Sequence, residues 1–142
     1  MSFVTLKQQI KTKLEAITQI QEVSDYPTQD FQGYPAAMVR TDGNVSEYET
    51  TSENQEIYNF TVILLQILEG TLDEEKARDV MESLCDVVRD AFDSDEFLSG
   101  ISLPADRVMI GIKPTVSDIG VDEDGKFVIS EIELAVRVQK SI

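Results

Sequence analysis

The segment GVDEDGKFVISE, which begins at Gly120, comes closer to a metal site than any other part of the sequence. Asp122, Asp124, Gly125 and Glu131 match the third, fifth, sixth and twelfth positions of a calcium-binding loop. Such a loop also needs an acidic first ligand, and here that position is Gly120. A helix should follow the loop, whereas the residues after Gly125 alternate like a strand. The segment therefore predicts a hairpin, with Asp124 and Gly125 as its two-residue turn.

Residues for catalysis are scarce. The chain has no histidine to act as a general base or zinc ligand, and a single cysteine, Cys85, which excludes paired-cysteine chemistry. It has no glycine-rich phosphate loop. Without histidine to activate it, Cys85 is expected to be a small core residue. We therefore expect no enzyme activity and no catalytic, cofactor-binding or metal-binding residues.

Composition indicates a folded, soluble protein. The chain has 142 residues, of which 42% are hydrophobic and 27% charged, and we expect one domain over residues 1–142. Apolar runs such as Val62–Leu65 are far shorter than the roughly 20 residues of a membrane span. The N-terminal residues lack the apolar core of a signal peptide, so a cytosolic origin is expected.

The charge of the chain is strongly negative and unevenly distributed. There are 27 acidic and 12 basic residues, a net charge of −15. Residues 41–106 hold 17 acidic and three basic residues, which is −14. Such a field repels nucleic acid phosphates and anionic membranes, which argues against binding through a basic patch. Solubility alone is the simplest explanation of the charge.

Two amphipathic helices are predicted. The first has apolar residues at steps of three and four: Phe3, Leu6, Ile10, Leu14 and Ile17. Thr71 and Glu74 form a capping box that starts the second. Its apolar face comprises Ala77, Val80, Met81, Leu84, Val87, Val88, Ala91 and Phe92. Its opposite face is acidic and comprises Glu75, Asp79, Glu82, Asp86, Asp90 and Asp93.

The remaining segments predict strands. The aromatic loop YPTQDFQGYP leads into a short strand, AAMVR, and residues 57–68 form a strand buried on both faces at its centre. The polar stretch between them, TDGNVSEYETTSENQE, is a hairpin or a long exposed loop. RVMIGIKP is a strand in which Pro114 limits central pairing. In the last strand Ile132 and its apolar neighbours at every second residue face away from Glu131, Glu133 and Arg137.

The order of these elements resembles the tail terminator, or tail-completion, proteins of long-tailed bacteriophages and their neck-region relatives. The resemblance rests on the lysine-bearing first helix, YPAAMVR, EIYNFTVILLQIL, the acidic helix DEEKARDVMESLCDVVRDAF and the closing strands from Arg107. It implies an α+β fold, with a mixed or antiparallel sheet flanked by two main helices. It also implies a hexameric ring that ends tail-tube polymerisation and joins the tail to the head. The implied partners are further copies of the chain, the tail tube protein and the head–tail connector protein. The implied location is the neck end of the virion tail, after assembly in the host cytoplasm.

The ring suggests where the acidic residues act. A channel that passes DNA without binding it should be negative, because repulsion keeps the phosphates from adhering. The polar stretch is then a hairpin that lines the channel or contacts a neighbouring subunit, through Glu47, Tyr48, Glu49, Glu53 and Glu56. A solvated loop without such a role is the alternative.

Other functions remain open. An acidic protein of this size is also expected for a DNA mimic, whose carboxylates occupy the phosphate-binding groove of a partner. The acidic face of the second helix would supply them, although it is equally typical of a solvated helix face. A neck or head-completion protein of similar fold and a general interaction domain are the remaining alternatives.

Overall fold

A computed structural model describes residues 3–26, 31–48, 53–68, 73–94, 107–117, 119–123 and 125–141. Its elements, in chain order, are α1 (Phe3–Glu15), β1 (Glu22–Ser24), β2 (Ala36–Tyr48), β3 (Glu53–Ile67), α2 (Glu74–Ser94), β4 (Arg107–Val116), β5 (Gly120–Val121) and β6 (Phe127–Ser141). Both predicted helices and the expected α+β class are confirmed.

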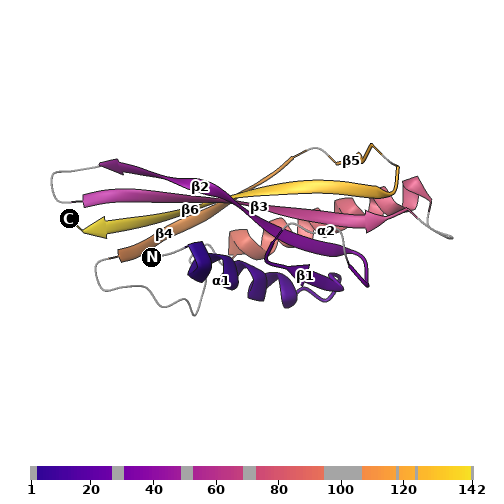
Figure 1. Ribbon diagram of the computed structural model, residues 1–142, viewed down its shortest axis with the longest axis horizontal. Helices are drawn as coiled ribbons and strands as arrows, with labels where there is room; N and C mark the ends of the chain where they lie inside the picture. The colour runs from indigo at the N-terminus through magenta and orange to yellow at the C-terminus, as the bar shows by residue number, and fades with distance from the viewer. Residues whose placement is uncertain are drawn as a thin grey trace.

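The strands form one mixed sheet in the order β1-β2-β3-β6-β4, and β5 pairs with β6. Only the pairing of β1 with β2 is parallel, and the other neighbours are antiparallel. The sheet is long and strongly twisted, and the ends of β2, β3, β6 and β4 extend beyond both helices (Figure 1). This projecting part of the sheet, which we call the arm, contains the end of β2 and the start of β3.

Both helices pack on one face of the sheet. Leu6, Ile10 and Leu14 of α1 are fully buried, as the spacing of their apolar side chains predicts. The helices share one core with alternate residues of the central strands, which include Phe60 and Leu134. This is the periodicity of strands with one face buried. The alternation predicted for the last strand is therefore confirmed.

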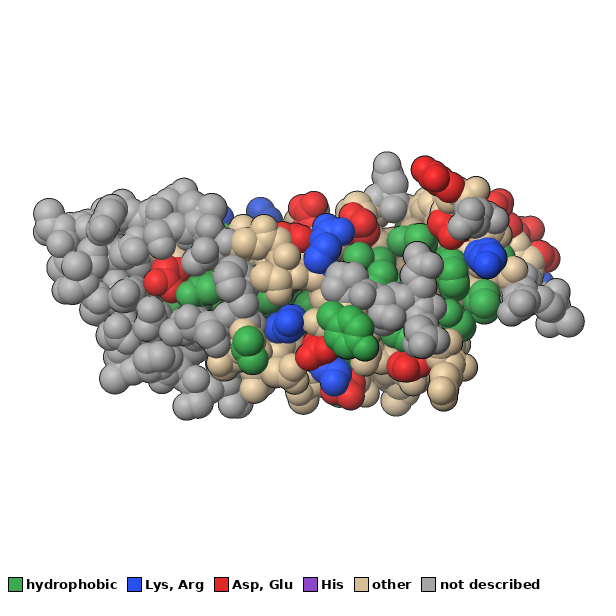
Figure 2. Space-filling model, viewed as in Figure 1, with side chains coloured by type: hydrophobic (Ala, Val, Ile, Leu, Met, Phe, Trp, Pro, Cys, Tyr) green, Lys and Arg blue, Asp and Glu red, His purple; other side chains and the backbone are tan. Residues whose placement is uncertain are grey.

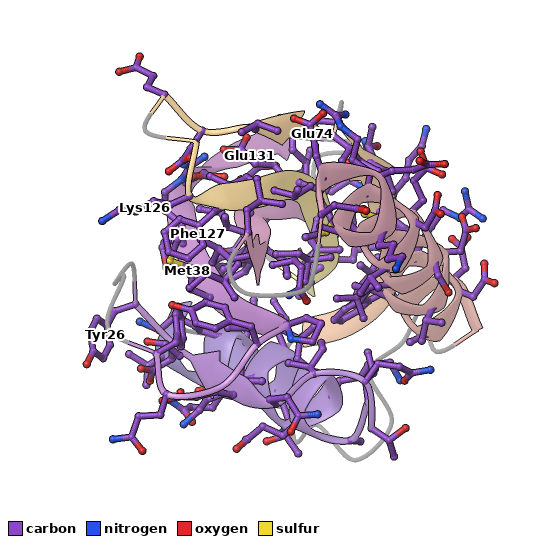
Figure 3. All side chains as sticks on the ribbon, turned by 90° about the vertical axis from the view of Figure 1, so that its right-hand side faces the viewer. Tyr26, Met38, Glu74, Lys126, Phe127 and Glu131 are labelled. Carbon is purple, nitrogen blue, oxygen red and sulfur yellow. The ribbon has the colours of Figure 1, made fainter. Side chains whose placement is uncertain are left out.

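A second, smaller core covers one end of the opposite face. It contains Met38, Ile63, Leu65 and Phe127, and Phe31 and Tyr34 of the aromatic loop pack against it. The Tyr34 ring lies 5.6 Å from that of Phe127, and Figure 3 shows Phe127 beside Met38. The loop is therefore anchored by two of its aromatic side chains, Phe31 and Tyr34. Tyr26 is the exception, because it is 62% exposed and projects away from the sheet.

Two local predictions differ from the structure. The strand predicted as AAMVR continues to Tyr48, because the polar residues after Arg40 pair with β3. Helix α2 begins at Glu74, where Asp73 accepts a hydrogen bond from the Lys76 amide (2.9 Å) and so acts as the N-cap. Thr71, the predicted cap, lies outside the described residues.

Of the turn predicted at Asp124 and Gly125, Asp124 lies outside the described residues, and Gly125 lies in the connection between β5 and β6. The Asp122 amide donates to the Phe127 carbonyl (3.0 Å), which closes a loop of four residues. The Asp122 carboxylate accepts hydrogen bonds from the amides of Lys126 (2.8 Å) and Phe127 (3.1 Å). Gly125 has a φ of 70°, the positive value expected of a turn glycine. The carboxylate therefore organises the loop, which explains the resemblance to a calcium-binding segment.

Candidate functional surfaces

The predicted hairpin is present, and its strands β2 and β3 pair to the end of the arm. Their register runs from Ala36 opposite Leu65 to Tyr48 opposite Asn54. Glu47, Tyr48 and Glu53 therefore occupy the last paired positions of the two strands. Glu49 lies outside the described residues.

Glu56, the last of the predicted hairpin residues, is buried, with 7% of its surface exposed. Its carboxylate accepts a hydrogen bond from the Tyr58 hydroxyl (2.7 Å). Residues two apart in a strand point to the same face, and here that face carries the main core. Burial and this hydrogen bond give Glu56 a structural role in the protomer, so we leave it out of the charge that the hairpin presents.

The sequence predicts only the β6 part of a second polar surface, the sheet face opposite the helices, and the part contributed by β2 and β4 was missed. Arg40 and Asp42 of β2 form an ion pair (2.8 Å), and the Thr61 hydroxyl of β3 donates to Asp42. Arg40 also donates to that hydroxyl (3.3 Å), and Thr61 is only 1% exposed. The carboxylates of Asp42, Glu131 and Glu133 raise the pKa of Arg40, chiefly through the hydrogen bond with Asp42. This network fixes the charged side chains at the centre of the face.

We call this surface the polar sheet face. Register places its charged residues together: Arg40, Asp42, Lys113, Glu131, Glu133 and Arg137. The three acidic and three basic residues balance, and Figure 2 shows charges of both signs mixed over the middle of the molecule. A hollow of about 340 Å³ on this face is bordered by Asp42, Lys113 and Glu133. The alternation of polar residues in the strands was the signal that could have revealed it.

A third surface is the exposed side of α2. Glu75, Asp79, Glu82, Asp86, Asp90 and Asp93 are all exposed, as predicted. Arg89 neutralises part of this row through contacts with Asp86 (3.3 Å) and Asp90 (3.6 Å). Five residues of the predicted apolar face are buried: Ala77, Met81, Leu84, Val88 and Phe92. Val87 and Ala91 are half-buried. Val80 is 38% exposed beside a hollow of about 380 Å³ that Leu84 and Pro35 also line.

Among the described residues, no three acidic or cysteine side chains converge as metal ligands. Cys85 is buried, and burial raises the pKa of its thiol, which disfavours the thiolate that a nucleophile needs. Within the same residues, no helix is both long and apolar enough to span a membrane.

The sequence matches no protein-family model and is similar to no curated protein. Its fold, in contrast, matches a chain in a solved structure of the virion of a native gene transfer agent (GTA) particle. The TM-score is 0.63 at 12% sequence identity, and the match covers 99% of this chain and 100% of the virion chain. The two chains therefore share a fold over their whole lengths.

Proposed function

We propose that this protein is a structural component of a phage-like virion. The observation that carries the proposal is the shared fold with a chain of a virion particle, which leaves almost no residue of either chain unmatched. The described surfaces agree with it, because they offer charged and polar contact areas.

More specifically, we assign it the role of a tail terminator. In this role, copies of the chain form a hexameric ring at the neck end of the tail. The ring ends growth of the tail tube and receives the head–tail connector, and DNA passes through its channel. The order of the sequence elements and the mixed sheet with two helices support this assignment.

The negative channel is assigned to the hairpin at the end of the arm. Glu47 and Glu53 lie in the strands at this end, Glu49 lies between them in the sequence, and the arm reaches beyond the helices. The polar sheet face is a poorer channel lining, because its three acidic residues are balanced by three basic ones. DNA would be held by the basic residues of such a face rather than repelled.

The ring is tested by native mass spectrometry and negative-stain microscopy of the purified protein over a range of concentrations. Both are repeated with the tail tube protein added. A closed six-fold ring with an open channel is expected. A protein that stays monomeric in the presence of tail tubes and leaves their length unchanged would refute the assignment.

The channel lining is tested by charge reversal. Replacing Glu47, Glu49 and Glu53 with lysine should leave the fold intact but reduce DNA delivery by assembled particles, since phosphates would adhere to the channel. The control variant reverses Asp79, Glu82 and Asp93 of α2, which changes the net charge by the same amount. Normal delivery by the hairpin variant, or equal loss in both variants, contradicts the assignment.

The DNA-mimic alternative is favoured by one observation, the row of exposed carboxylates on α2. The row from Asp79 to Asp93 spans about 21 Å along a rigid helix at 1.5 Å per residue. A mimic should displace DNA from a basic DNA-binding protein, and reversal of the α2 residues should abolish the displacement. The ring assignment predicts that neither the unmodified protein nor the α2 variant displaces DNA.

A further inference from the structure

The sheet has two outer edges along which no described strand pairs. β4 is the last strand on one side, so its outer edge is open from Arg107 to Val116. On the other side β1 pairs only with residues 36–38, which leaves β2 open from Val39 to Tyr48. Unpaired strand edges carry rows of amide and carbonyl groups that readily pair with another chain. On β4 this row of amides is interrupted at Pro114, which has no amide to donate, so pairing there uses the residues on either side of it.

The two open edges have the same length and lie at the same levels along the strand direction. Each open segment contains ten residues, about 33 Å of strand. The register across the sheet places Val39, Val62, Ile132 and Val116 in one row. At the other end, Tyr48 stands in one row with Arg107. The two edges therefore start and finish at the same levels of the sheet.

The direction of the strands also matches. β2, β3, β6 and β4 are successively antiparallel, so β4 runs opposite to β2. If copies are arranged head to tail, β4 of one copy meets β2 of the next in the antiparallel orientation. Two strands, β3 and β6, lie between the two edge strands. Because this number is even, strand directions continue to alternate where one copy meets the next.

Charge complements this geometry. Among the ten residues of β4, Arg107 and Lys113 are charged, and both are basic. The open segment of β2 contains two acidic residues, Asp42 and Glu47, and one basic residue, Arg40, which pairs with Asp42 and leaves the segment with one net negative charge. Lys113 stands in the same row as Gly43, next to Asp42, and is exposed without an ion pair within the described residues. If the rows of two copies are aligned, Lys113 of one copy therefore lies close to Asp42 of the next.

We infer that the open edge of β4 pairs, antiparallel and at equal height, with the open edge of β2 in a second copy of this chain. Repetition of this contact joins the sheets of successive copies. Because all copies point the same way along their strands, the hairpins then surround the channel at one rim of the ring. The inference rests on the proposed ring, which it deepens by naming the strands that form the subunit contact. Each edge is used once per copy, so the contact is heterologous and can close a ring.

Cysteine crosslinking tests the contact. In a Cys85→Ala background, one protein carries Asp42→Cys and another carries Lys113→Cys, and oxidised glutathione is the oxidant. β3 and β6 separate the two positions by about 14 Å along the sheet of one copy, beyond the roughly 7 Å Cα separation that a disulfide tolerates. Thermal unfolding establishes that each variant is folded.

Disulfides are expected when the two single-cysteine proteins are mixed and absent when either is oxidised alone. A protein that carries both substitutions should form a ladder of crosslinked oligomers. Crosslinking of the Lys113→Cys protein to itself would show that two β4 edges pair about a two-fold axis, which overturns the inference. A mixture without disulfides, made from proteins that form rings by native mass spectrometry, overturns it too and leaves the proposed function standing.

Charge reversal supplies a test that leaves Asp42 unchanged. Lys113→Glu should raise the concentration needed for ring formation about tenfold at low salt, since attraction becomes repulsion. Lys126→Glu is the control, because Lys126 is exposed in the loop before β6 and away from both edges. Unchanged assembly of Lys113→Glu contradicts the contact. If the unmodified protein forms no ring with or without tail tubes, the proposed function and this inference both fail.

Discussion

The core that fixes α2 against the sheet can be tested at Leu84, with Val80 of the same helix as a matched control. Leu84 is 2% exposed and belongs to the main core, whereas Val80, one turn earlier, is 38% exposed. Both residues border the same surface hollow. Truncating each to alanine therefore compares burial at two neighbouring positions of one helix.

Leu84→Ala should lower the free energy of unfolding by about 3 kcal/mol. Truncation of a buried leucine costs about 2.7–5 kcal/mol, through lost transfer free energy and the cavity left behind. We place the value near the lower end because the hollow beside Leu84 lets neighbouring side chains relax into the space. With a total stability of about 5–15 kcal/mol, the variant should remain folded and its stability measurable.

Val80→Ala should change the stability by less than about 0.5 kcal/mol. Val80 loses little burial, and replacing a β-branched residue with alanine improves helix propensity by a similar amount. Urea unfolding followed by circular dichroism measures both values, and Leu84→Ala should also lower Tm by about 10 °C. A loss below about 1 kcal/mol for Leu84→Ala, or equal losses at both positions, would refute the assignment of the α2 core face.

Three further predictions concern local interactions. Tyr58→Phe should cost about 1.5–3 kcal/mol, since it removes a hydrogen bond to the buried carboxylate of Glu56, and Glu56→Gln should cost less; urea unfolding compares them. Asp73→Ala should cost about 1 kcal/mol by removing the N-cap of α2, whereas Asp73→Asn should be nearly neutral in the same assay. Burial raises the pKa of Cys85, so the unfolded chain loses the thiol proton first. Stability should therefore fall as pH rises above about 8.5, with a slope of at most about 1.4 kcal/mol per pH unit, and Cys85→Ala should remove this component.

Much of the fold could be predicted because local periodicity reports burial. The steps of three and four in α1 and α2 and the alternation in β6 gave these elements close to their observed bounds. β2 was different, because the residues after Arg40 show no regular apolar alternation and include Gly43. Its length depends on pairing with β3, a distant segment whose register no local pattern specifies. The same holds for β1, a three-residue strand that pairs with β2 in parallel.

The burial of Glu56 could have been predicted from the period of two in a strand. Glu56 was grouped with its acidic neighbours because it lies in a polar stretch. It also stands two residues before Tyr58 and four before Phe60, both of which face the main core. The period of two in a strand therefore points the Glu56 carboxylate to the interior, a signal that the sequence itself contains. The network of Arg40, Asp42 and Thr61 was harder to predict, since it depends on the register of β2 with β3.

The distribution of charge narrows the choice of a channel surface. The polar sheet face is neutral, which leaves the hairpin and α2 as the described elements with excess negative charge. Seven acidic residues face three basic ones in α2, and the helix starts at the end of the molecule opposite the hairpin (Figure 1). A ring with the hairpins around its axis therefore places the start of α2 away from the channel, and the reverse orientation exposes α2 to DNA. Because one protomer orientation cannot place both at the axis, the two charge-reversal variants should differ in DNA delivery, and the impaired variant identifies the lining.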